Sequence, residues 1–251
     1  MKTALIDVGN TRVKWAQLDS SGHLTSTGAE LHLGELNAVT GVLSAALADC
    51  ARVFVSSVGG GDWRAELSAA FGSATRLEFV AVQAEAYGLR CGYREPARLG
   101  VDRWVAMIAA YHSVGGAVCV IDAGTTVTFD SVDAGGRHHG GLIFAGPRLM
   151  AGALDRGTRQ IGTTRIAEYR PQGLDLLGHD TDQAVGQASM LGLSAGLDAA
   201  VTAVAEALGR VPLVLLTGGD AHLLAPWLET DVQTRADLVL EGLAYIANQS
   251  D

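Results

Sequence analysis

The chain contains 251 residues, of which 48% are hydrophobic and 18% are charged, enough for one large domain or two small ones around a sizeable core. Its formal net charge is −9, which argues against general affinity for nucleic acids or anionic membranes, because both reward clustered Lys and Arg. No apolar run approaches the ~20 residues of a membrane span, and no secretory signal pattern opens the chain. We therefore expect a globular protein of the cytoplasm.

The three cysteines, Cys50, Cys91 and Cys119, lack the spacing of a metal site. Cys119 lies in an apolar, strand-like run and Cys50 ends a helical stretch, so both are expected to be core thiols. A reducing compartment fits this use of cysteine.

The first half of the chain alternates strand-like and helix-like patterns. The expected elements are strands at 3–8, 13–18 and 23–29, a helix at 31–47, a strand at 52–58, a helix at 62–71 and a strand at 77–82. Three strands followed by alternating helices and strands predict a mixed sheet with helices on its faces. An irregular segment at 92–100 then leads into a helix at 102–113.

The second half begins with another hairpin. Its expected elements are strands at 117–121 and from residue 126, a strand at 139–144, a helix ending near Arg156, a long helix at 181–208, a strand from Val211 and a helix at 237–247. Residues 160–180 hold most of the polar irregular structure. We expect the last helix to close the second of two domains, which divide the chain into 1–116 and 117–251.

Two stretches repeat one pattern, in which an apolar strand ends at an aspartate and a glycine-containing turn leads into a second strand. They are Asp7-Val8-Gly9-Asn10-Thr11 and Asp122-Ala123-Gly124-Thr125-Thr126. An aspartate at a strand end can meet a cation, and a glycine lets a phosphate approach the backbone. Hydroxyls beside exposed N–H groups suit phosphate oxygens.

A single copy of this pattern is weak evidence, because a β-hairpin with Gly and Asn in its turn needs no ligand. Two copies, 122 − 7 = 115 residues apart, are harder to explain by structure alone. Together they predict a duplicated domain in which two hairpins grip one phosphate chain from opposite sides.

Asp102 and Arg103 open the helix at 102–113. On the residues alone, Asp102 fits a helix N-cap, the usual role of Asp at a helix start, and Arg103 fits a solvated surface charge. A role in a functional site stays open at this point. The glycines at 218 and 219 have the same two interpretations, an ordinary strand-to-helix turn or a place for a nucleotide base or ribose.

Four segments together carry a family resemblance. They are Asp7-Val8-Gly9-Asn10-Thr11 with Lys14, Leu99-Gly100-Val101-Asp102-Arg103-Trp104, Asp122-Ala123-Gly124-Thr125-Thr126 and Leu216-Thr217-Gly218-Gly219-Asp220. In this order, and over nearly the whole chain, they resemble the type III pantothenate kinases, which belong to the superfamily of acetate and sugar kinases, chaperone ATPases and actin. The resemblance implies an α/β fold of two ribonuclease-H-like domains, each a mixed β-sheet flanked by helices, with ATP in the cleft between them.

The resemblance also implies roles for individual residues. The ATP-binding residues would be Asp7, Val8, Gly9, Asn10, Thr11, Arg12, Val13, Lys14 and Thr125, with Asp7 near the Mg²⁺ of Mg-ATP. Asp122 is similar to the family's ligand for a monovalent cation, K⁺ or NH₄⁺. Asp102 matches the family's general base, and the pantothenate pocket would be Tyr93, Gly100, Val101, Asp102, Arg103 and Thr181.

Two of these assignments carry a structural condition. Thr181 would reach the pocket from the other subunit of a homodimer. Arg12 stands at a position that is not fixed in the family, so it either contacts phosphate or faces solvent.

The implied reaction is ATP-dependent phosphorylation of pantothenate to 4′-phosphopantothenate, the first step of coenzyme A biosynthesis. One alternative is another kinase of the superfamily with a sugar or acetate acceptor, although residues 99–104 with Tyr93 resemble a pantothenate pocket. A second alternative is a non-enzymatic accessory factor for transcription, as which some family members were first described. The acidic balance and the lack of a basic helix argue against direct DNA binding.

Overall fold

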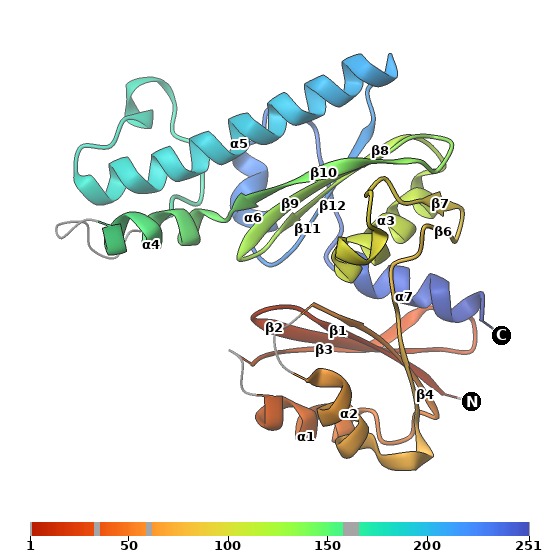
Figure 1. Ribbon diagram of the computed structural model, residues 1–251. Helices are drawn as coiled ribbons and strands as arrows, with labels where there is room; N and C mark the ends of the chain where they lie inside the picture. Colours follow the sequence, from red (N-terminus) through yellow and green to blue (C-terminus); the bar gives the residue numbers. More distant parts are fainter. Residues whose placement is uncertain (1, 33–35, 59–61, 158–165, 251) are drawn as a thin grey trace. The chain divides into compact units, whose positions relative to one another are not determined.

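The computed structural model describes residues 2–32, 36–58, 62–157 and 166–250, and the chain groups into two compact units. The first unit comprises Met1–Ser113 and Asp237–Asp251, and the second comprises Val114–Ala236. Each unit contains a five-stranded sheet with parallel and antiparallel pairs, flanked by helices (Figure 1). The predicted α/β class with two mixed, helix-flanked sheets is confirmed.

The sheet of the first unit has the strand order β3-β2-β1-β4-β5. Its strands are β1 (Thr3–Val8), β2 (Arg12–Leu18), β3 (Leu24–Leu31), β4 (Arg52–Ser57) and β5 (Arg76–Phe79). The first three strands form an antiparallel meander, whereas β4 and β5 run parallel to β1. Helices α1 (Leu36–Ala46) and α2 (Trp63–Phe71) connect the parallel strands, which need crossover connections of this kind. The order of elements is the predicted one.

One expected boundary in this unit is wrong. The helix predicted at 31–47 begins at Leu36 in the structure, and Leu31 instead ends β3, where it pairs with Arg12. Residues 33–35 lie outside the described part of the chain. The helical spacing of leucines concealed the strand, because pairing with β2 depends on residues nearly twenty positions away.

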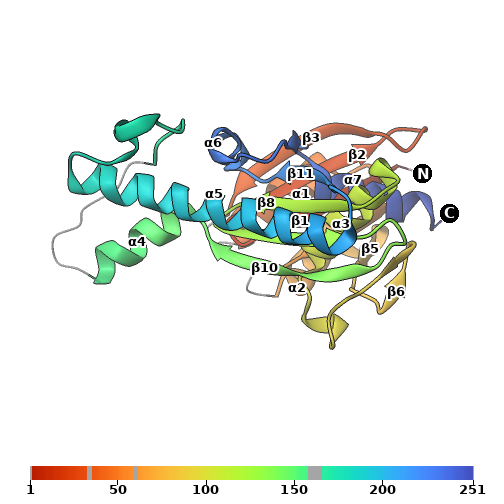
Figure 2. The same cartoon turned by 90° about the horizontal axis from the view of Figure 1, so that it is seen from above.

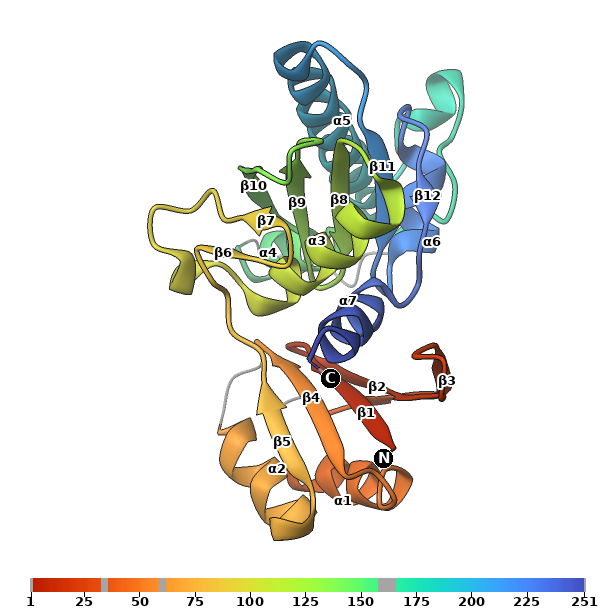
Figure 3. The ribbon, with the colours of Figure 1, turned by 90° about the vertical axis from the view of Figure 1, so that its right-hand side faces the viewer.

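Side-chain alternation along β1 decides which helices cover which face of the first sheet. Ala4, Ile6 and Val8 share the face that packs against α1 and α2. The residues of that core from the helical layer are Val39, Leu43, Leu47, Trp63 and Leu67. Figure 3 shows α1 and α2 on this face and α7 (Leu238–Asn248) on the opposite one.

Helix α7 therefore belongs to the first unit, not to the second as expected. It contacts β1, β2, β3 and β4, and Nδ2 of Asn248 donates to the carbonyl of Gly22 at 3.3 Å. Gly242 also lets α7 approach α3 (Val101–Val114), because a Cβ there would clash with the carbonyl of Val105. Local periodicity identifies this helix, but both sheets offer apolar faces, so the sequence does not say which one it covers.

The sheet of the second unit has the order β10-β9-β8-β11-β12. Its strands are β8 (Val118–Ala123), β9 (Thr126–Val132), β10 (His138–Ala145), β11 (Leu213–Thr217) and β12 (Gln233–Thr234). Again the first three strands are antiparallel, and the last two run parallel to β8. The two sheets thus share one topology, with β1 and β8 at equivalent central places, as the repeated Asp-containing motif predicts.

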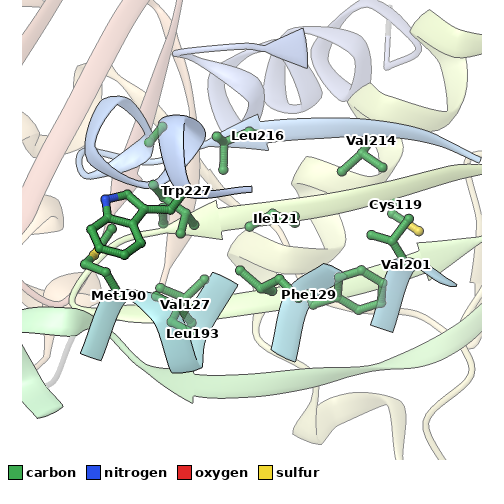
Figure 4. Packing of buried hydrophobic residues seen from close by; sticks show 14 residues of the cluster. Cys119, Ile121, Val127, Phe129, Met190, Leu193, Val201, Val214, Leu216 and Trp227 are labelled. Carbon is green, nitrogen blue, oxygen red and sulfur yellow. The ribbon is translucent and has the colours of Figure 1, made fainter. Parts of the chain in front are cut away.

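Helix α5 (Thr181–Leu208) forms the core of the second unit by lying across its sheet (Figure 2). Figure 4 shows Met190, Leu193 and Val201 of α5 directed at the side chains of the strands. The strand residues of this cluster include Cys119, Ile121, Val127, Phe129, Val214 and Leu216. The length and composition of α5 would suit a membrane span, but its apolar stripe packs on the sheet, as in core helices of soluble proteins.

The buried cysteines behave as the sequence predicts. Burial raises the pKa of Cys119 to about 12 and also raises the pKa of Cys50. Both side chains lie in the hydrophobic clusters of their units. Thiols of this kind stay protonated at neutral pH and act as small apolar side chains.

Two further helices complete the second unit. Helix α4 (Pro147–Gly157) follows β10 and packs against α5, and the short helix α6 (Ala221–Leu224) follows β11. A small hairpin of β6 (Glu85–Ala86) and β7 (Leu89–Arg90) precedes α3 in the first unit. The sequence patterns do not indicate this hairpin or β12, because strands of two residues carry no periodicity.

Candidate active site

The first loop, residues 9–12, joins the two central strands of the first sheet. Val8 pairs with Val13 across the hairpin, and the N–H of Gly9 donates to the carbonyl of Arg12 at 3.0 Å. A Cβ on Gly9 would lie 3.2 Å from that carbonyl oxygen, so a larger residue would strain the closure. Arg12 is exposed at the rim of the loop.

Asp7 and Lys14 face each other at the base of this loop. They are direct partners in the antiparallel ladder, so their side chains share one face of the sheet. Nζ of Lys14 also lies 3.3 Å from Oδ1 of Asp237, the residue that precedes α7. This contact brings together residues 223 positions apart in the chain, and no local pattern points to Asp237.

The second loop, residues 123–126, occupies the equivalent place in the second sheet. Ala123 pairs with Val127, and the N–H of Gly124 donates to the carbonyl of Thr126 at 3.1 Å. Gly146 packs directly behind the loop, where its N–H donates to the carbonyl of Thr125 at 3.0 Å. A Cβ on Gly146 would lie 2.5 Å from the same oxygen. The side chain of Thr125 is exposed at the tip.

Asp122, the last but one residue of β8, lies between two threonines of the neighbouring strands. It pairs with Thr128 on β9 and with Thr217 on β11, so one carboxylate and two hydroxyls lie in a row on one face of the sheet. Gly218 has φ +96°, a left-handed conformation, and a Cβ there would lie 2.5 Å from Oδ1 of Asp122. The sequence signals Asp122 and Gly218, whereas the two threonines are identified by the sheet register alone.

Asp102 lies in the first turn of α3, which begins at Val101. Its Oδ1 accepts the N–H of Arg103 at 2.7 Å, and the N–H of Trp104 donates to the carbonyl of Gly100 at 3.1 Å. Asp102 is therefore the second residue of the helix, and the N-cap interpretation is wrong. A Cβ on Gly100 would lie 2.5 Å from Oδ1 of Asp102, so the glycine leaves room for the carboxylate.

Arg103 is only 7% exposed, so its interpretation as a solvated surface charge is also wrong. Its Nη1 donates to the hydroxyl of Tyr93 at 2.9 Å, and its Cζ lies 5.6 Å from the centroid of the Tyr93 ring. A buried guanidinium is costly to desolvate, and its donors are held here in a fixed place by the contact with Tyr93. Such a group is suited to receive an anion.

Thr181 is the first residue of α5, and its side chain is exposed. The helix is capped by Asp180, whose carboxylate accepts the N–H of Gln183 at 2.8 Å. Tight packing of the preceding segment at Gly178, where a Cβ would clash with the backbone of Ala184, fixes this helix start.

The predicted site residues thus fall into three clusters. In the first unit, Asp7 and Lys14 meet at the first loop, and Tyr93 and Arg103 meet beside Asp102. In the second unit, Asp122 lies at the base of the loop that carries Thr125. Of the described residues, no group of three or more His, Cys, Asp or Glu side chains could hold a metal ion.

Comparisons with known proteins give one family. The family model described as type III pantothenate kinase matches residues 4–204. A type III pantothenate kinase of Nitrosococcus oceani is 35% identical over 258 residues, covering 98% of this chain and 94% of that protein. One of Alkalilimnicola ehrlichii is 36% identical over 253 residues, covering 98% of each.

A solved structure supports the fold. The crystal structure of a putative 2-dehydro-3-deoxygalactonokinase protein from Sinorhizobium meliloti has a TM-score of 0.59 and 17% identity, covering 99% of this chain and 96% of that one. Because the family match spans most of the chain and the curated relatives exceed 30% identity over nearly all of it, the chain belongs to the type III pantothenate kinases, the enzymes that phosphorylate pantothenate in coenzyme A biosynthesis.

Proposed function

We propose that Asp102, Arg103 and Tyr93 bind and activate pantothenate for attack on the γ-phosphoryl group of ATP. The buried Arg103–Tyr93 pair beside the Asp102 carboxylate carries this proposal. Pantothenate has a carboxylate, which a guanidinium binds by charge-assisted hydrogen bonds, and a primary hydroxyl, which a carboxylate can orient. A guanidinium binds a carboxylate more strongly than the neutral hydroxyls of a sugar, which supports a carboxylate-bearing acceptor.

The first loop suits ATP with Mg²⁺. Asp7 provides a hard carboxylate oxygen of the kind that Mg²⁺ accepts, directly or through water. Gly9 keeps the backbone of the loop accessible, and Lys14 adds an ammonium group on the same face as Asp7. When bound, Mg²⁺ neutralises charge that develops on the phosphate oxygens. Asn10, Thr11 and Arg12 complete this proposed nucleotide contact, to which Val8 and Val13, whose side chains are buried, contribute only their backbones. From the second loop, Thr125 is the proposed phosphate contact.

Asp102 is the proposed general base. As the bond forms between the pantothenate oxygen and the γ-phosphorus, the bond from that phosphorus to the bridging oxygen of ADP breaks, and the hydroxyl proton passes to Asp102. The hydrogen bond from the N–H of Arg103 fixes the carboxylate, so the base is positioned before the acceptor binds. In a loose transition state the proton leaves late, and orientation matters more than basicity.

We propose a monovalent-cation site, for K⁺ or NH₄⁺, at Asp122. The support is the row of oxygens formed by the Asp122 carboxylate and the hydroxyls of Thr128 and Thr217. A large monovalent cation prefers such hard oxygen ligands without demanding a strict geometry. Placed beside the second loop, its charge would offset that of the phosphates.

We also propose that the protein is a homodimer. Large apolar side chains are exposed on the edge strand β10, on α4 and before α5, namely Leu142, Ile143, Leu149, Leu174 and Leu177. Exposed apolar side chains gathered on such elements are typical of an interface between subunits. In such a dimer, Thr181 and Val101 belong to the proposed substrate pocket, with Thr181 supplied by the second subunit.

The proposed location is the cytoplasm, where ATP and K⁺ are abundant. The three cysteines are unpaired, which suits a reducing compartment. Cell fractionation tests this location, and enrichment in a membrane or secreted fraction would contradict it.

Replacing the base tests its role. We expect Asp102→Asn to lower kcat by roughly 10²–10⁴, the usual loss for a general base, while the thermal unfolding midpoint stays close to that of the wild type. The control is Asp62→Asn, because Asn also caps a helix and Asp62 caps α2 at an exposed position. Near-normal turnover of a folded Asp102→Asn protein would remove Asp102 from the mechanism.

Substitution of Arg103 should change the KM for the acceptor and not the KM for the nucleotide. Lys keeps the positive charge but lacks the planar fork, so we expect Arg103→Lys to raise the KM for pantothenate roughly 10–100-fold and leave the KM for ATP within about twofold. Arg94→Lys, at an exposed position nearby, is the control. An equal rise in both KM values would argue against a pocket specific for the acceptor.

The proposed cation site predicts that the reaction rate depends on which monovalent cation the buffer contains. Purified protein with Mg-ATP and pantothenate should release ADP and 4′-phosphopantothenate in K⁺ or NH₄⁺ buffer, with at least about tenfold lower rates in Na⁺ buffer. Asp122→Asn should remove the stimulation, whereas Asp49→Asn, at an exposed ion pair with Lys2, should keep it. Equal rates in Na⁺ and K⁺ would count against the cation site. Turnover of glucose or acetate, but not of pantothenate, would contradict pantothenate as the acceptor.

The dimer predicts a mass of twice the 26.0 kDa chain in sedimentation equilibrium. Ile143 is 63% exposed on β10, and a buried carboxylate is costly, so Ile143→Asp should shift the mass toward the monomer. Val211→Asp, at a residue that is 77% exposed elsewhere on the second unit, should leave the mass unchanged. A wild-type monomer at micromolar concentration would contradict the proposal.

A further inference from the structure

His32 lies directly after β3 and holds the back of the first loop. Its side chain is almost completely buried, and the residue is only 4% exposed. The ring Nε2 lies 2.9 Å from the carbonyl oxygen of Gly9, and the backbone N–H of His32 donates to the carbonyl of Thr11 at 3.0 Å. One residue therefore holds two carbonyls of the loop, one through its side chain and one through its main chain.

The acceptor determines which nitrogen of the His32 ring carries a hydrogen. A carbonyl oxygen only accepts hydrogen bonds, so Nε2 of His32 carries the hydrogen and donates it to Gly9. The ring also packs edge-to-face on Trp63 of α2, with centroids 5.1 Å apart and planes at 79°. The donor is thus held by β3 through the chain and by α2 through its ring.

Because of the geometry of the peptide bond, these two contacts also determine which way the N–H groups of the loop point. The described part of the chain contains no cis peptide bond, and across a trans peptide the C=O and the next N–H point in opposite directions. With the Gly9 carbonyl directed at His32, the N–H of Asn10 points away from it. With the Thr11 carbonyl directed at the His32 backbone, the N–H of Arg12 also points away.

We propose that His32 is a positioning residue for ATP, which turns the N–H groups of Asn10 and Arg12 toward the phosphates by holding the carbonyls of Gly9 and Thr11 from behind. The inference rests on the proposed binding of the ATP phosphates at the first loop. His32 itself does not touch the nucleotide. It acts by excluding a rotated peptide, in which a carbonyl oxygen would face the phosphate and repel it.

The second loop shares only the main-chain part of this arrangement. There, the N–H of Asp220 donates to the carbonyl of Ala123 at 2.9 Å, and the N–H of Gly146 donates to the carbonyl of Thr125 at 3.0 Å. The corresponding main-chain donors at the first loop are the N–H of Val58, which donates to the carbonyl of Val8 at 3.0 Å, and the N–H of His32. The bond from the His32 side chain to Gly9 is additional to these contacts, and a side-chain donor is accessible to substitution.

Three substitutions of His32 distinguish the effect of losing the hydrogen-bond donor from the effect of losing the volume of the ring. In Gln, the side-chain nitrogen stands at the same number of bonds from Cα as Nε2 of His, so His32→Gln keeps a donor near Gly9. His32→Leu fills most of the space without a donor, and His32→Asn keeps a polar group that is too short to reach. His23→Leu is the control, because its side chain is exposed in the neighbouring turn.

We expect His32→Leu and His32→Asn to raise the KM for ATP about tenfold, the effect of losing roughly one hydrogen bond to an anion, with the KM for pantothenate within about twofold of wild type. The Kd of ADP, measured by calorimetry without turnover, should rise by a similar factor. His32→Gln should restore most of both values, and His23→Leu should change neither.

Several results would overturn the inference. A fall in kcat with both KM values unchanged would make His32 a merely structural residue. Equal nucleotide affinities of the Gln and Asn variants would show that the bond to Gly9 does not orient the loop, and this comparison holds even where the Leu variant does not fold. The ADP titration also distinguishes failure of this inference from failure of the proposed function. An ADP affinity that depends on His32, in a protein that makes no phosphorylated product, would refute the proposed function and leave this inference standing.

Discussion

A backbone loop that receives phosphate must turn its carbonyl oxygens away, because each of them would repel the anion. A carbonyl turned away from the site needs a donor on its far side, since an unpaired buried carbonyl is costly. In this chain the donors come from the ends of neighbouring strands. His32 follows β3 and Val58 follows β4, on either side of the first hairpin, just as Gly146 follows β10 and Asp220 follows β11, on either side of the second. The shared strand order of the two sheets therefore places the donors as well as the loops.

Close packing behind the second loop explains where its glycines stand. Gly146 and Gly218 each come so near to the loop that a Cβ would meet its carbonyl oxygens or the carboxylate of Asp122. Gly218 also needs its left-handed φ of +96° to turn the chain from β11 toward α6. Behind the first loop, the backbone N–H groups of Val58 and His32 hold the corresponding carbonyls, and the buried ring of His32 adds a contact with Gly9. Two loops of similar sequence thus share their main-chain donors and differ in side-chain packing.

Sequence patterns predict the elements of this fold well where the periodicity is long and local. The hairpins that follow Asp7 and Asp122, the long helix α5 and the order of elements in the first unit could all be predicted. The patterns fail where a role depends on distant pairing, as in the placement of α7 or the pair of Lys14 and Asp237. His32 has no motif, because its function comes from a register that brings the end of β3 to the first loop.

The same limit applies to the acceptor side of the site. The sequence places Asp102 and Arg103 at the start of a helix, where a cap and a surface charge are the ordinary expectations. Only the contact with Tyr93, ten residues earlier in an irregular segment, shows that the guanidinium is buried. A buried guanidinium that contacts Tyr93 next to the Asp102 carboxylate is a stronger indication of a ligand site than either residue in the sequence, because burying the group costs stability that a solvated arginine would not.

The acidity of the chain, with a net charge of −9, is compatible with a triphosphate substrate for the same structural reason. Lys14 is shared with Asp237, and Arg103 lies at the start of α3 with Tyr93, so cationic side chains supply only part of the compensation that the proposed site requires. Oriented N–H groups supply local positive potential without adding net charge. A site built in this way lets nucleotide affinity and overall charge vary independently. The chain can stay acidic, and so avoid polyanions such as nucleic acids, while each of its two short loops presents oriented backbone donors.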